Sequence, residues 1–437
     1  NKGVAIAYDS RNMSIEFSKW TALCLNANGI KTYRFESLRP TPELSFALRT
    51  LGCTAGIVVT ASHNPAIYNG IKVFTRGGRD ADQEQTQEIE NYIRNVEADI
   101  EAGKAVPRMD YEEAKNAGLV VEFNPLNEYI DSIISRINMQ AIRDRGLRVA
   151  LDPLYGVSQT SLKTILSIAR CEVETIHERH DTLFGGKLPA PNATTLRPLQ
   201  NYVLDRYCDI GIATDGDADR IGVIDDTGRF LHPNDILVLL YYYLVKYKGW
   251  SGPVVRNVAT THMLDRVAES FGQECCEVPV GFKYISAKMQ ETDAVIGGES
   301  SGGLTVRGHI NGKDGIYAAS LLVEMIAVTG KKLSEIAKEI EQEYGEIHMV
   351  ERDYRFTPLR KEQIHKTLMI DKLLPKLPYA ISKVSYLDGC KVYFQNGGWI
   401  IARFSGTEPL LRIFCEMESK LAAMELVDIF EEFLELK

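Results

Sequence analysis

Thr60-Ala61-Ser62-His63-Asn64-Pro65 directly follows the apolar run Gly56-Ile57-Val58-Val59, so a hydroxyl and an imidazole stand where a predicted strand ends. The proline ring pushes Asn64 out of the α region, which prevents the stretch from continuing as a helix. We therefore expect Ser62 on a short exposed loop at the carboxyl end of a strand, where open α/β sheets bind their ligands. Taken alone, the same residues suit a structural turn equally well.

The composition is typical of a globular protein with several domains. At 437 residues the chain is too long for one ordinary core, which predicts roughly three or four domains. A net charge of −9 argues against non-specific binding of nucleic acid. No apolar run reaches the roughly 18 residues that a membrane span needs. The eight cysteines lack Cys-x-x-Cys spacing, so we expect reduced thiols in a cytoplasmic protein.

Three segments share a strand–helix–strand pattern. Their predicted strand pairs are 4–8 with 31–35, 147–151 with 171–176, and 253–255 with 275–280. Units of about 30 residues with this order favour parallel strands joined by a right-handed crossover. The apolar stretch 236–245 predicts a buried helix. A second helix is predicted over 87–100, with one apolar face formed by Ile89, Tyr92, Ile93, Val96 and Ile100.

The pattern changes near residue 345, after which short strands alternate with turns and a helix over 420–436 closes the chain. This change predicts an α+β tail domain. We therefore expect an α/β fold with three similar mixed-sheet domains and a smaller C-terminal α+β domain around a central cleft. The predicted domains are 1–107, 108–227, 228–347 and 348–437.

The strongest local signal is Thr214-Asp215-Gly216-Asp217-Ala218-Asp219-Arg220. Three carboxylates at alternate positions suit one hard cation, magnesium or calcium. An EF-hand loop begins with this spacing, but its sixth position requires glycine, where this chain has Arg220, and a strand precedes the motif. A solvated acidic turn is the remaining alternative. Three like charges repel unless a cation neutralises them, which favours a metal.

Two further loops carry polar groups after predicted strands. In Gly297-Gly298-Glu299-Ser300-Ser301-Gly302-Gly303, the glycines allow close backbone approach, and Glu299 and Ser301 suit the hydroxyls of a sugar. Lys283, His309 and Lys313 flank this loop. In Arg403-Phe404-Ser405-Gly406-Thr407-Glu408-Pro409, with Arg412 downstream, arginine and backbone N–H groups suit an anion such as phosphate. A plain glycine-rich turn and a surface turn are the respective alternatives.

Together the four motifs resemble those of the α-D-phosphohexomutase superfamily, which includes phosphoglucomutases and phosphomannomutases. The matching stretches are 60–65, 215–220, 298–302 and 403–409, in family order and spread over nearly the whole chain. The resemblance implies four domains around a central cleft, each contributing one motif. It also implies interconversion of hexose 1-phosphate and hexose 6-phosphate through a phosphoserine and a bound hexose 1,6-bisphosphate.

The resemblance further implies a role for individual residues. Ser62 becomes phosphorylated and holds one Mg²⁺ together with Asp215, Asp217 and Asp219. Arg11 and Lys72 lie near the reacting phosphate, and either His63 or Lys72 accepts the proton. The predicted substrate-binding residues are Arg220, Lys283, Glu299, Ser301, His309, Arg403, Ser405, Gly406, Thr407 and Arg412. The expected partners are small sugar phosphates, with neither nucleic acid nor membrane.

Two departures from the family pattern affect these expectations. The chain has no Phe-Gly-Thr…Arg-Gly strand, so we expect an N-terminally truncated first domain. The sugar loop reads Glu-Ser-Ser-Gly-Gly, whereas phosphomannomutases and phosphoglucosamine mutases more often have Met or Gln after the glutamate and His after the glycine. We therefore predict a phosphoglucomutase, with those two mutases as alternatives. A phosphatase that uses the same phosphoserine and a non-catalytic sugar-phosphate-binding relative also stay open.

Overall fold

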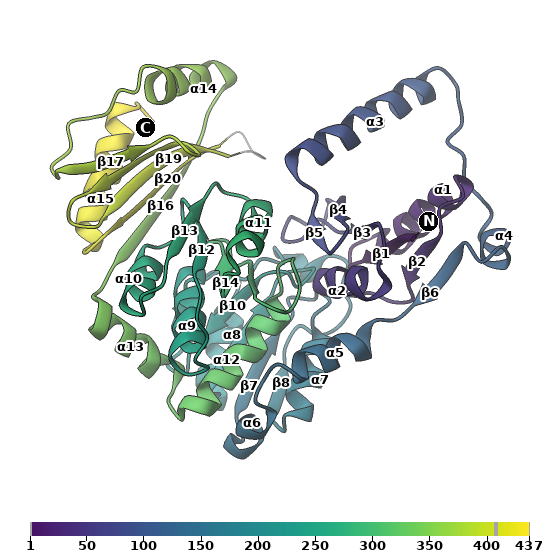
Figure 1. The fold of residues 1–437 in the computed structure, drawn as a ribbon, viewed down its shortest axis with the longest axis horizontal. Helices are drawn as coiled ribbons and strands as arrows, with labels where there is room; N and C mark the ends of the chain where they lie inside the picture. The colour runs from purple at the N-terminus through teal and green to yellow at the C-terminus, as the bar shows by residue number, and fades with distance from the viewer. Residues whose placement is uncertain (1, 406–409, 437) are drawn as a thin grey trace.

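The computed structural model describes residues 2–405 and 410–436. Four β-sheets follow one another along the chain, and the last is antiparallel throughout (Figure 1). The predicted fold is confirmed: three α/β domains with mixed sheets precede a C-terminal α+β domain. Among the described residues, no helix combines the length and the apolar character that crossing a bilayer requires.

The first sheet has the strand order β5-β4-β3-β1-β2-β6. Its central strand β1 is buried at every position, as expected for an apolar strand with parallel neighbours on both sides. The elements of this domain are β1 (Val4–Tyr8), α1 (Ser14–Ala27), β2 (Thr32–Phe35), α2 (Thr41–Leu51), β3 (Ala55–Val59), β4 (Ile71–Thr75), β5 (Arg79–Asp80), α3 (Gln83–Glu101), α4 (Tyr111–Asn116) and β6 (Val120–Phe123).

The predicted boundary at residue 107 is too early. Strand β6 lies beyond it, yet pairs in parallel with β2 and completes the first sheet. The predicted helix over 87–100 is present as α3, but it begins at Gln83 because Asp82 caps the N–H of Gln85. None of its residues is buried, and Figure 1 shows α3 projecting away from the first sheet.

The second and third sheets share the largest hydrophobic core, in which α9 (Pro233–Lys246) is buried from Ile236 to Val245, as predicted. The second sheet has the order β11-β10-β9-β7-β8. Its domain contains α5 (Leu126–Ile134), α6 (Met139–Arg145), β7 (Arg148–Asp152), α7 (Gln159–Ile168), β8 (Glu172–Thr175), η1 (Phe184–Gly186), α8 (Arg197–Arg206), β9 (Ile210–Thr214), β10 (Ile221–Ile224) and β11 (Phe230–Leu231).

The third sheet has the order β13-β12-β14-β15. Its elements are α9 (Pro233–Lys246), β12 (Val254–Asn257), α10 (Met263–Ser270), β13 (Cys275–Val278), α11 (Phe282–Thr292), β14 (Ile296–Gly298), β15 (Leu304–Val306), α12 (Gly315–Thr329) and α13 (Leu333–Tyr344). The second and third segments repeat the predicted strand–helix–strand pattern with parallel pairing of β7 with β8 and of β12 with β13.

The fourth sheet has the order β16-β20-β19-β18-β17 and packs against α15. Its elements are β16 (His348–Arg355), α14 (Pro358–His365), η2 (Lys366–Ile370), β17 (Ile381–Ser385), β18 (Cys390–Phe394), β19 (Trp399–Phe404), β20 (Leu410–Met417) and α15 (Lys420–Phe433). The four motifs therefore follow β3, β9, β14 and β19, one strand in each sheet.

Candidate active site

Ser62 lies in the turn after β3 and is buried, not exposed as predicted. Its side chain faces the second domain, where its Oγ donates to Asp215 Oδ2 at 2.7 Å, and the residue is only 5% exposed. The backbone has a φ of 50°, a left-handed conformation that costs energy in a residue with a side chain. Thr60 supports this turn because its Oγ1 accepts the Ser62 N–H at 2.8 Å.

Arg11 binds the backbone of the loop that contains Ser62. Its guanidinium donates to the backbone carbonyls of Ser62 and Asn64 at 2.7 Å, and to those of Pro65 and Tyr68 at 2.9 Å. Its Nε also lies 3.2 Å from Asp9 Oδ2, in a pair whose side chains are both fully buried. The structure thus uses Arg11 to shape the loop that presents the serine.

We expect Arg11→Ala to destabilise the fold by about 3–5 kcal/mol, because it leaves a buried carboxylate without its charged partner and removes a donor from each of four carbonyls. Thermal unfolding and hydrogen exchange over residues 60–68 measure this loss. Arg148→Ala is the matched control, since Arg148 pairs with Glu172 on the surface and should cost about 1 kcal/mol or less. Equal losses in the two variants, with unchanged exchange in the loop, would contradict this role of Arg11.

The three aspartates of the acidic motif converge as predicted. Ligand atoms of Asp215, Asp217 and Asp219 lie within 4.8 Å of one another, and all three side chains are buried. Burial, and next the charges of its two neighbours, raises the pKa of Asp215 well above its usual range. Within the described chain, Asp217 Oδ1 and Asp219 Oδ1 are buried without a hydrogen-bond partner. Carboxylate oxygens in this arrangement fit a hard divalent cation, with the Ser62 hydroxyl beside them.

Two lysines neutralise part of this charge. Lys72 Nζ lies 2.7 Å from Asp217 Oδ2 and 3.0 Å from Asp219 Oδ2, and Lys313 Nζ lies 2.8 Å from Asp219 Oδ2. Burial alone would lower the pKa of Lys72, but the charges of Asp217 and Asp219 outweigh it and raise that pKa. Lys313 was not among the predicted binding residues. Its stem fills the space beside Gly303, where a Cβ would lie 2.4 Å from Lys313 Cδ.

His63 and Arg220 stand at the edge of the same cluster. Arg220 Nε lies 4.0 Å from Asp219 Oδ1. The backbone of Arg220 also pairs with that of Gly303 in an isolated antiparallel β-bridge, which joins the acidic loop to the sugar loop. Burial, and next the nearby Arg220 charge, lowers the pKa of His63 to about 4, so the imidazole is neutral at pH 7. Its Nδ1 is buried and has no hydrogen-bond partner in the described part of the chain.

Glu299 and Ser301 share the loop between β14 and β15. Ser301 Oγ lies 3.4 Å from Glu299 Oε2, while Glu299 Oε1 accepts the N–H of Gly281 at 3.2 Å. This second contact brings the turn that carries Lys283 next to the sugar loop. Lys283 is half-buried, with its ammonium over the ring of Tyr284.

The prediction that His309 binds substrate is wrong. The imidazole is 3% exposed and is packed between the rings of Tyr129 and Tyr317. Its Nε2 lies 2.7 Å from Asp314, the residue that caps the N-terminus of α12. His309 therefore stabilises the start of a core helix.

Arg403 and Arg412 occupy paired positions on β19 and β20, at the end of the fourth sheet. Arg403 Nη2 lies 3.4 Å from Asp388 Oδ2, and Arg412 Nε lies 3.5 Å from Asp353 Oδ1. Ser405 donates its N–H to the carbonyl of Leu410, which closes the base of the loop. Gly406 and Thr407 lie outside the described residues.

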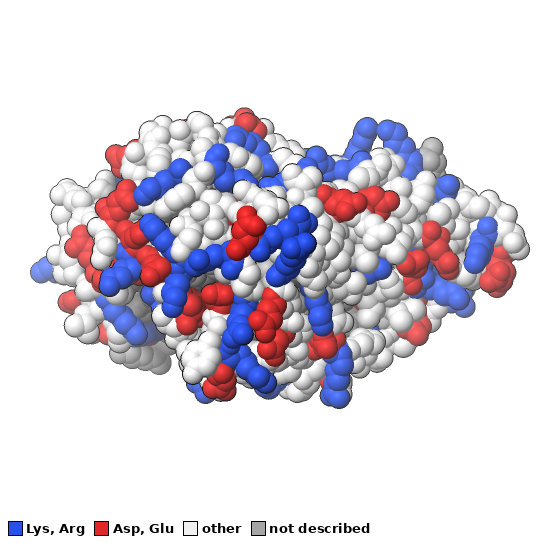
Figure 2. All heavy atoms as spheres, turned by 90° about the horizontal axis from the view of Figure 1, so that it is seen from below, with Lys and Arg blue, Asp and Glu red and all other residues white. Residues whose placement is uncertain are grey.

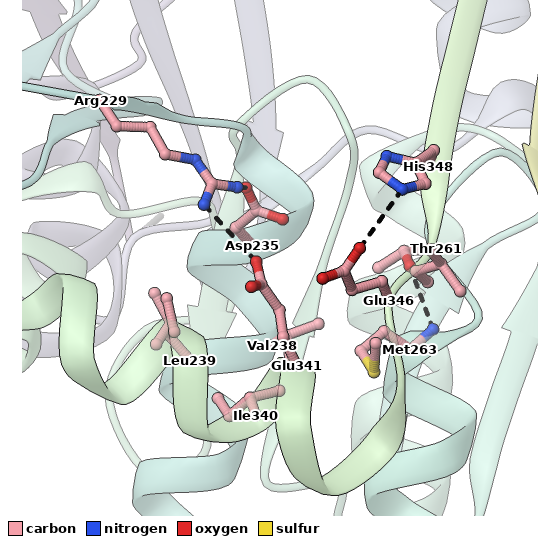
Figure 3. A pocket seen from close by; sticks show the side chains of 12 residues that line it. Arg229, Asp235, Val238, Leu239, Thr261, Met263, Ile340, Glu341, Glu346 and His348 are labelled. Atoms are coloured by element: carbon pink, nitrogen blue, oxygen red, sulfur yellow. Dashed lines mark hydrogen bonds and ion pairs between the residues drawn. The ribbon is translucent and has the colours of Figure 1, made fainter. Parts of the chain in front are cut away.

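A separate cavity of about 260 Å³ lies where the linker to the fourth domain passes α9 and α13 (Figure 3). Its wall combines Val238, Leu239 and Ile340 with the ion pair between Arg229 and Glu341. No motif residue of the described chain lines it. We therefore do not place the reaction there.

On the face shown in Figure 2, acidic and basic side chains are interspersed, without one continuous basic surface.

Models of the four phosphoglucomutase/phosphomannomutase domains match the chain in order. Alpha/beta/alpha domain I matches residues 1–99, domain II residues 127–228, domain III residues 232–344 and the C-terminal domain residues 366–433. The fold and the site therefore define a phosphohexomutase. The chain belongs to the α-D-phosphohexomutase superfamily and is an enzyme of the isomerase class, an intramolecular phosphotransferase.

Relatives from archaea and bacteria match nearly the whole chain. A phosphoglucomutase/phosphomannomutase of Thermococcus kodakarensis is 29% identical over 91% of this chain and 82% of its own. A "probable phosphoglucosamine mutase" of Pyrococcus abyssi is 31% identical over 99% of this chain and 90% of its own. The crystal structure of a candidate phosphomannomutase from Thermus thermophilus superimposes with a TM-score of 0.83, at 28% identity, covering 99% of this chain and 90% of that chain.

Proposed function

We propose that this enzyme interconverts a hexose 1-phosphate and a hexose 6-phosphate, with Ser62 as the phosphoryl carrier. The observation that carries the proposal is the hydrogen bond from Ser62 Oγ to Asp215 at 2.7 Å, which places a serine hydroxyl against the three-aspartate cluster. Phosphoryl transfer depends mainly on charge neutralisation and positioning, and this buried arrangement supplies both.

Asp215, Asp217 and Asp219, with an oxygen on Ser62, would hold one Mg²⁺. Magnesium bound there would neutralise charge on the phosphoryl group during transfer. Lys72, Lys313 and Arg220 add positive charge from the protein. Glu299 and Ser301 bind sugar hydroxyls, with Lys283 beside them. Arg403, Ser405 and Arg412, with Gly406 and Thr407, bind the phosphate that does not react.

In the forward half-reaction, the bond between phosphorus and Ser62 Oγ breaks while a bond forms from phosphorus to the free hydroxyl of the hexose phosphate. His63 accepts the proton of that hydroxyl, the proton finally replaces the phosphoryl group on Ser62 Oγ, and the products are a free Ser62 hydroxyl and a hexose 1,6-bisphosphate. This intermediate reverses its orientation in the site, and its other phosphoryl group is then transferred to Ser62. We assign the proton to His63 because its buried Nδ1 is unpaired within the described chain, whereas the Lys72 ammonium is held by two carboxylates.

For the sugar, we propose a hexosamine phosphate in place of the glucose phosphate that the loop sequence predicted. The names of the relatives support this choice, since several that are 30–33% identical are named "Probable phosphoglucosamine mutase". Glucose and mannose phosphates are the second candidates.

In a panel of 1-phosphates of glucosamine, glucose, mannose and N-acetylglucosamine, we expect the highest kcat/KM with glucosamine 1-phosphate. Mg²⁺ and a trace of the matching 1,6-bisphosphate should activate the reaction without net release of phosphate. Coupled assays of each 6-phosphate measure the preference. A higher kcat/KM with glucose 1-phosphate would return the assignment to phosphoglucomutase, and stoichiometric release of inorganic phosphate would indicate a phosphatase.

A further inference from the structure

The turn before β18 contacts two parts of the proposed site at once. Asp388 Oδ2 accepts the N–H of Val280 at 2.8 Å and lies 3.4 Å from Arg403 Nη2. Val280 belongs to the third domain, whereas Arg403 belongs to the fourth and is assigned to the non-reacting phosphate. One carboxylate oxygen therefore joins the two domains at a residue of the phosphate site.

The connection continues into the sugar loop through the next residue of the chain. Gly281 donates its N–H to Glu299 Oε1 at 3.2 Å. Its φ of 132° is readily adopted only by glycine, so this turn depends on it. Two successive backbone amides thus bind two carboxylates, Asp388 of the fourth domain and Glu299 of the sugar loop.

Gly389 fixes where the Asp388 carboxylate lies. It has a φ of 98°, and a Cβ there would lie 2.6 Å from the carbonyl oxygen of Ala402 and 2.7 Å from Arg403 Cβ. The turn is therefore packed directly on the backbone of Arg403. The arginine side chain is 12% exposed, so its orientation depends on these neighbours.

Strand β18, which directly follows the Asp388 turn, is anchored to the third domain by Lys391. Lys391 is 1% exposed, and its Nζ lies 2.7 Å from the Val258 carbonyl, 2.7 Å from Glu277 Oε2 and 3.0 Å from His262 Nε2. All three partners belong to the third domain. Separating the buried Lys391 side chain from these partners would leave them without their hydrogen bonds, so the Asp388 turn is held in place at the domain interface.

We propose that Asp388 is a positioning residue for the mutase reaction. Asp388 orients the Arg403 guanidinium so that the other edge of the guanidinium meets the non-reacting phosphate. Through Val280 and Gly281, it also sets the position of Arg403 relative to Glu299. An arginine binds phosphate best when its planar fork is fixed beforehand, because less freedom is then lost on binding. This inference rests on the function proposed above, and it adds a residue that no motif contains.

The test compares Asp388→Ala and Asp388→Asn with the matched control Asp428→Asn. Asp428 pairs with Arg352 at 2.8 Å elsewhere on the fourth domain, so the control also removes an ion pair. A residue that positions a binding group affects substrate and transition state alike, which raises KM and spares kcat. We expect Asp388→Ala to raise the KM for glucosamine 1-phosphate by about 10-fold with kcat within about 3-fold. Asp388→Asn keeps an acceptor for Val280 and should lie between Asp388→Ala and wild type.

Calorimetric binding of glucosamine 6-phosphate is the second measurement, because it requires no turnover. The Kd of Asp388→Ala should rise by the same factor as KM, while Asp428→Asn keeps wild-type values. Wild-type KM and Kd in Asp388→Ala would overturn the inference, as would equal changes in the control. If the wild-type enzyme binds the sugar phosphate but never converts it, the proposed function is contradicted. The comparison of Kd values would still test whether Asp388 positions the phosphate-binding arginine.

Discussion

Replacing Ser62 with alanine is expected to lower mutase turnover on the order of 10³-fold or more, because alanine has no hydroxyl to carry the phosphoryl group. The assay measures hexose 6-phosphate formed from the 1-phosphate with Mg²⁺ and activating bisphosphate present. Alanine removes the hydroxyl but leaves the loop contacts of Arg11 and Thr60 in place. The variant should therefore still bind sugar phosphates.

Ser161→Ala is the matched control for this experiment. Ser161 is also a buried serine that donates to a carboxylate, Glu43 Oε1, at 2.9 Å, but it lies on α7, and Glu43 on α2, outside the motifs. Its loss should cost about 1–2 kcal/mol of stability and leave turnover near that of wild type. Turnover of Ser62→Ala equal to that of Ser161→Ala would contradict the role of Ser62.

Asp215→Asn has the second largest expected effect. The amide still accepts the Ser62 hydroxyl, but it removes a charge from the cation site, so turnover should fall on the order of 10²-fold or more. The metal-free fold should lose little stability, because less repulsion among the carboxylates offsets the acceptor that the Arg220 N–H loses. Mg²⁺ should raise the melting temperature of the wild type, since a ligand that binds only the folded state stabilises it. This shift should be much smaller in the variant.

Parallel thermal scans with and without Mg²⁺ separate this effect from a loss of folding. Asp205→Asn, an exposed carboxylate on α8 in the same domain, serves as the control and should keep both the turnover and the Mg²⁺ shift. If Asp215→Asn retained the full Mg²⁺ shift and wild-type turnover, the cation would not be bound by this cluster.

Local sequence patterns predict most of the fold and the central residues of the four motifs. An apolar strand followed by a polar turn is visible in the sequence, which is why the turns after β3, β9, β14 and β19 were found. The position of β6 was missed because its pairing with β2 depends on a return of the chain after α3, which no local pattern records. Strand β16 is hard to recognise in the sequence because its alternating half-buried and exposed residues include many charged side chains.

The contacts between motifs were beyond sequence reasoning. Lys313 reaches Asp219 only because Gly303 leaves space for its stem, and the two residues are far apart in the chain. His309 failed as a binding residue because Asp314 holds it at a helix cap in the core. The family resemblance implies a place for Arg11 near the site, but its hydrogen bonds to four loop carbonyls are visible only in the fold.

The most direct test of the account is to follow a labelled phosphoryl group. The enzyme is incubated with Mg²⁺ and hexose 1,6-bisphosphate carrying radiolabelled phosphate, then digested and mapped, before and after a chase with unlabelled hexose 6-phosphate. The account predicts label on the peptide containing Ser62 and its transfer to the sugar during the chase. Label on another residue, or label released only as inorganic phosphate while the enzyme is active, would contradict it.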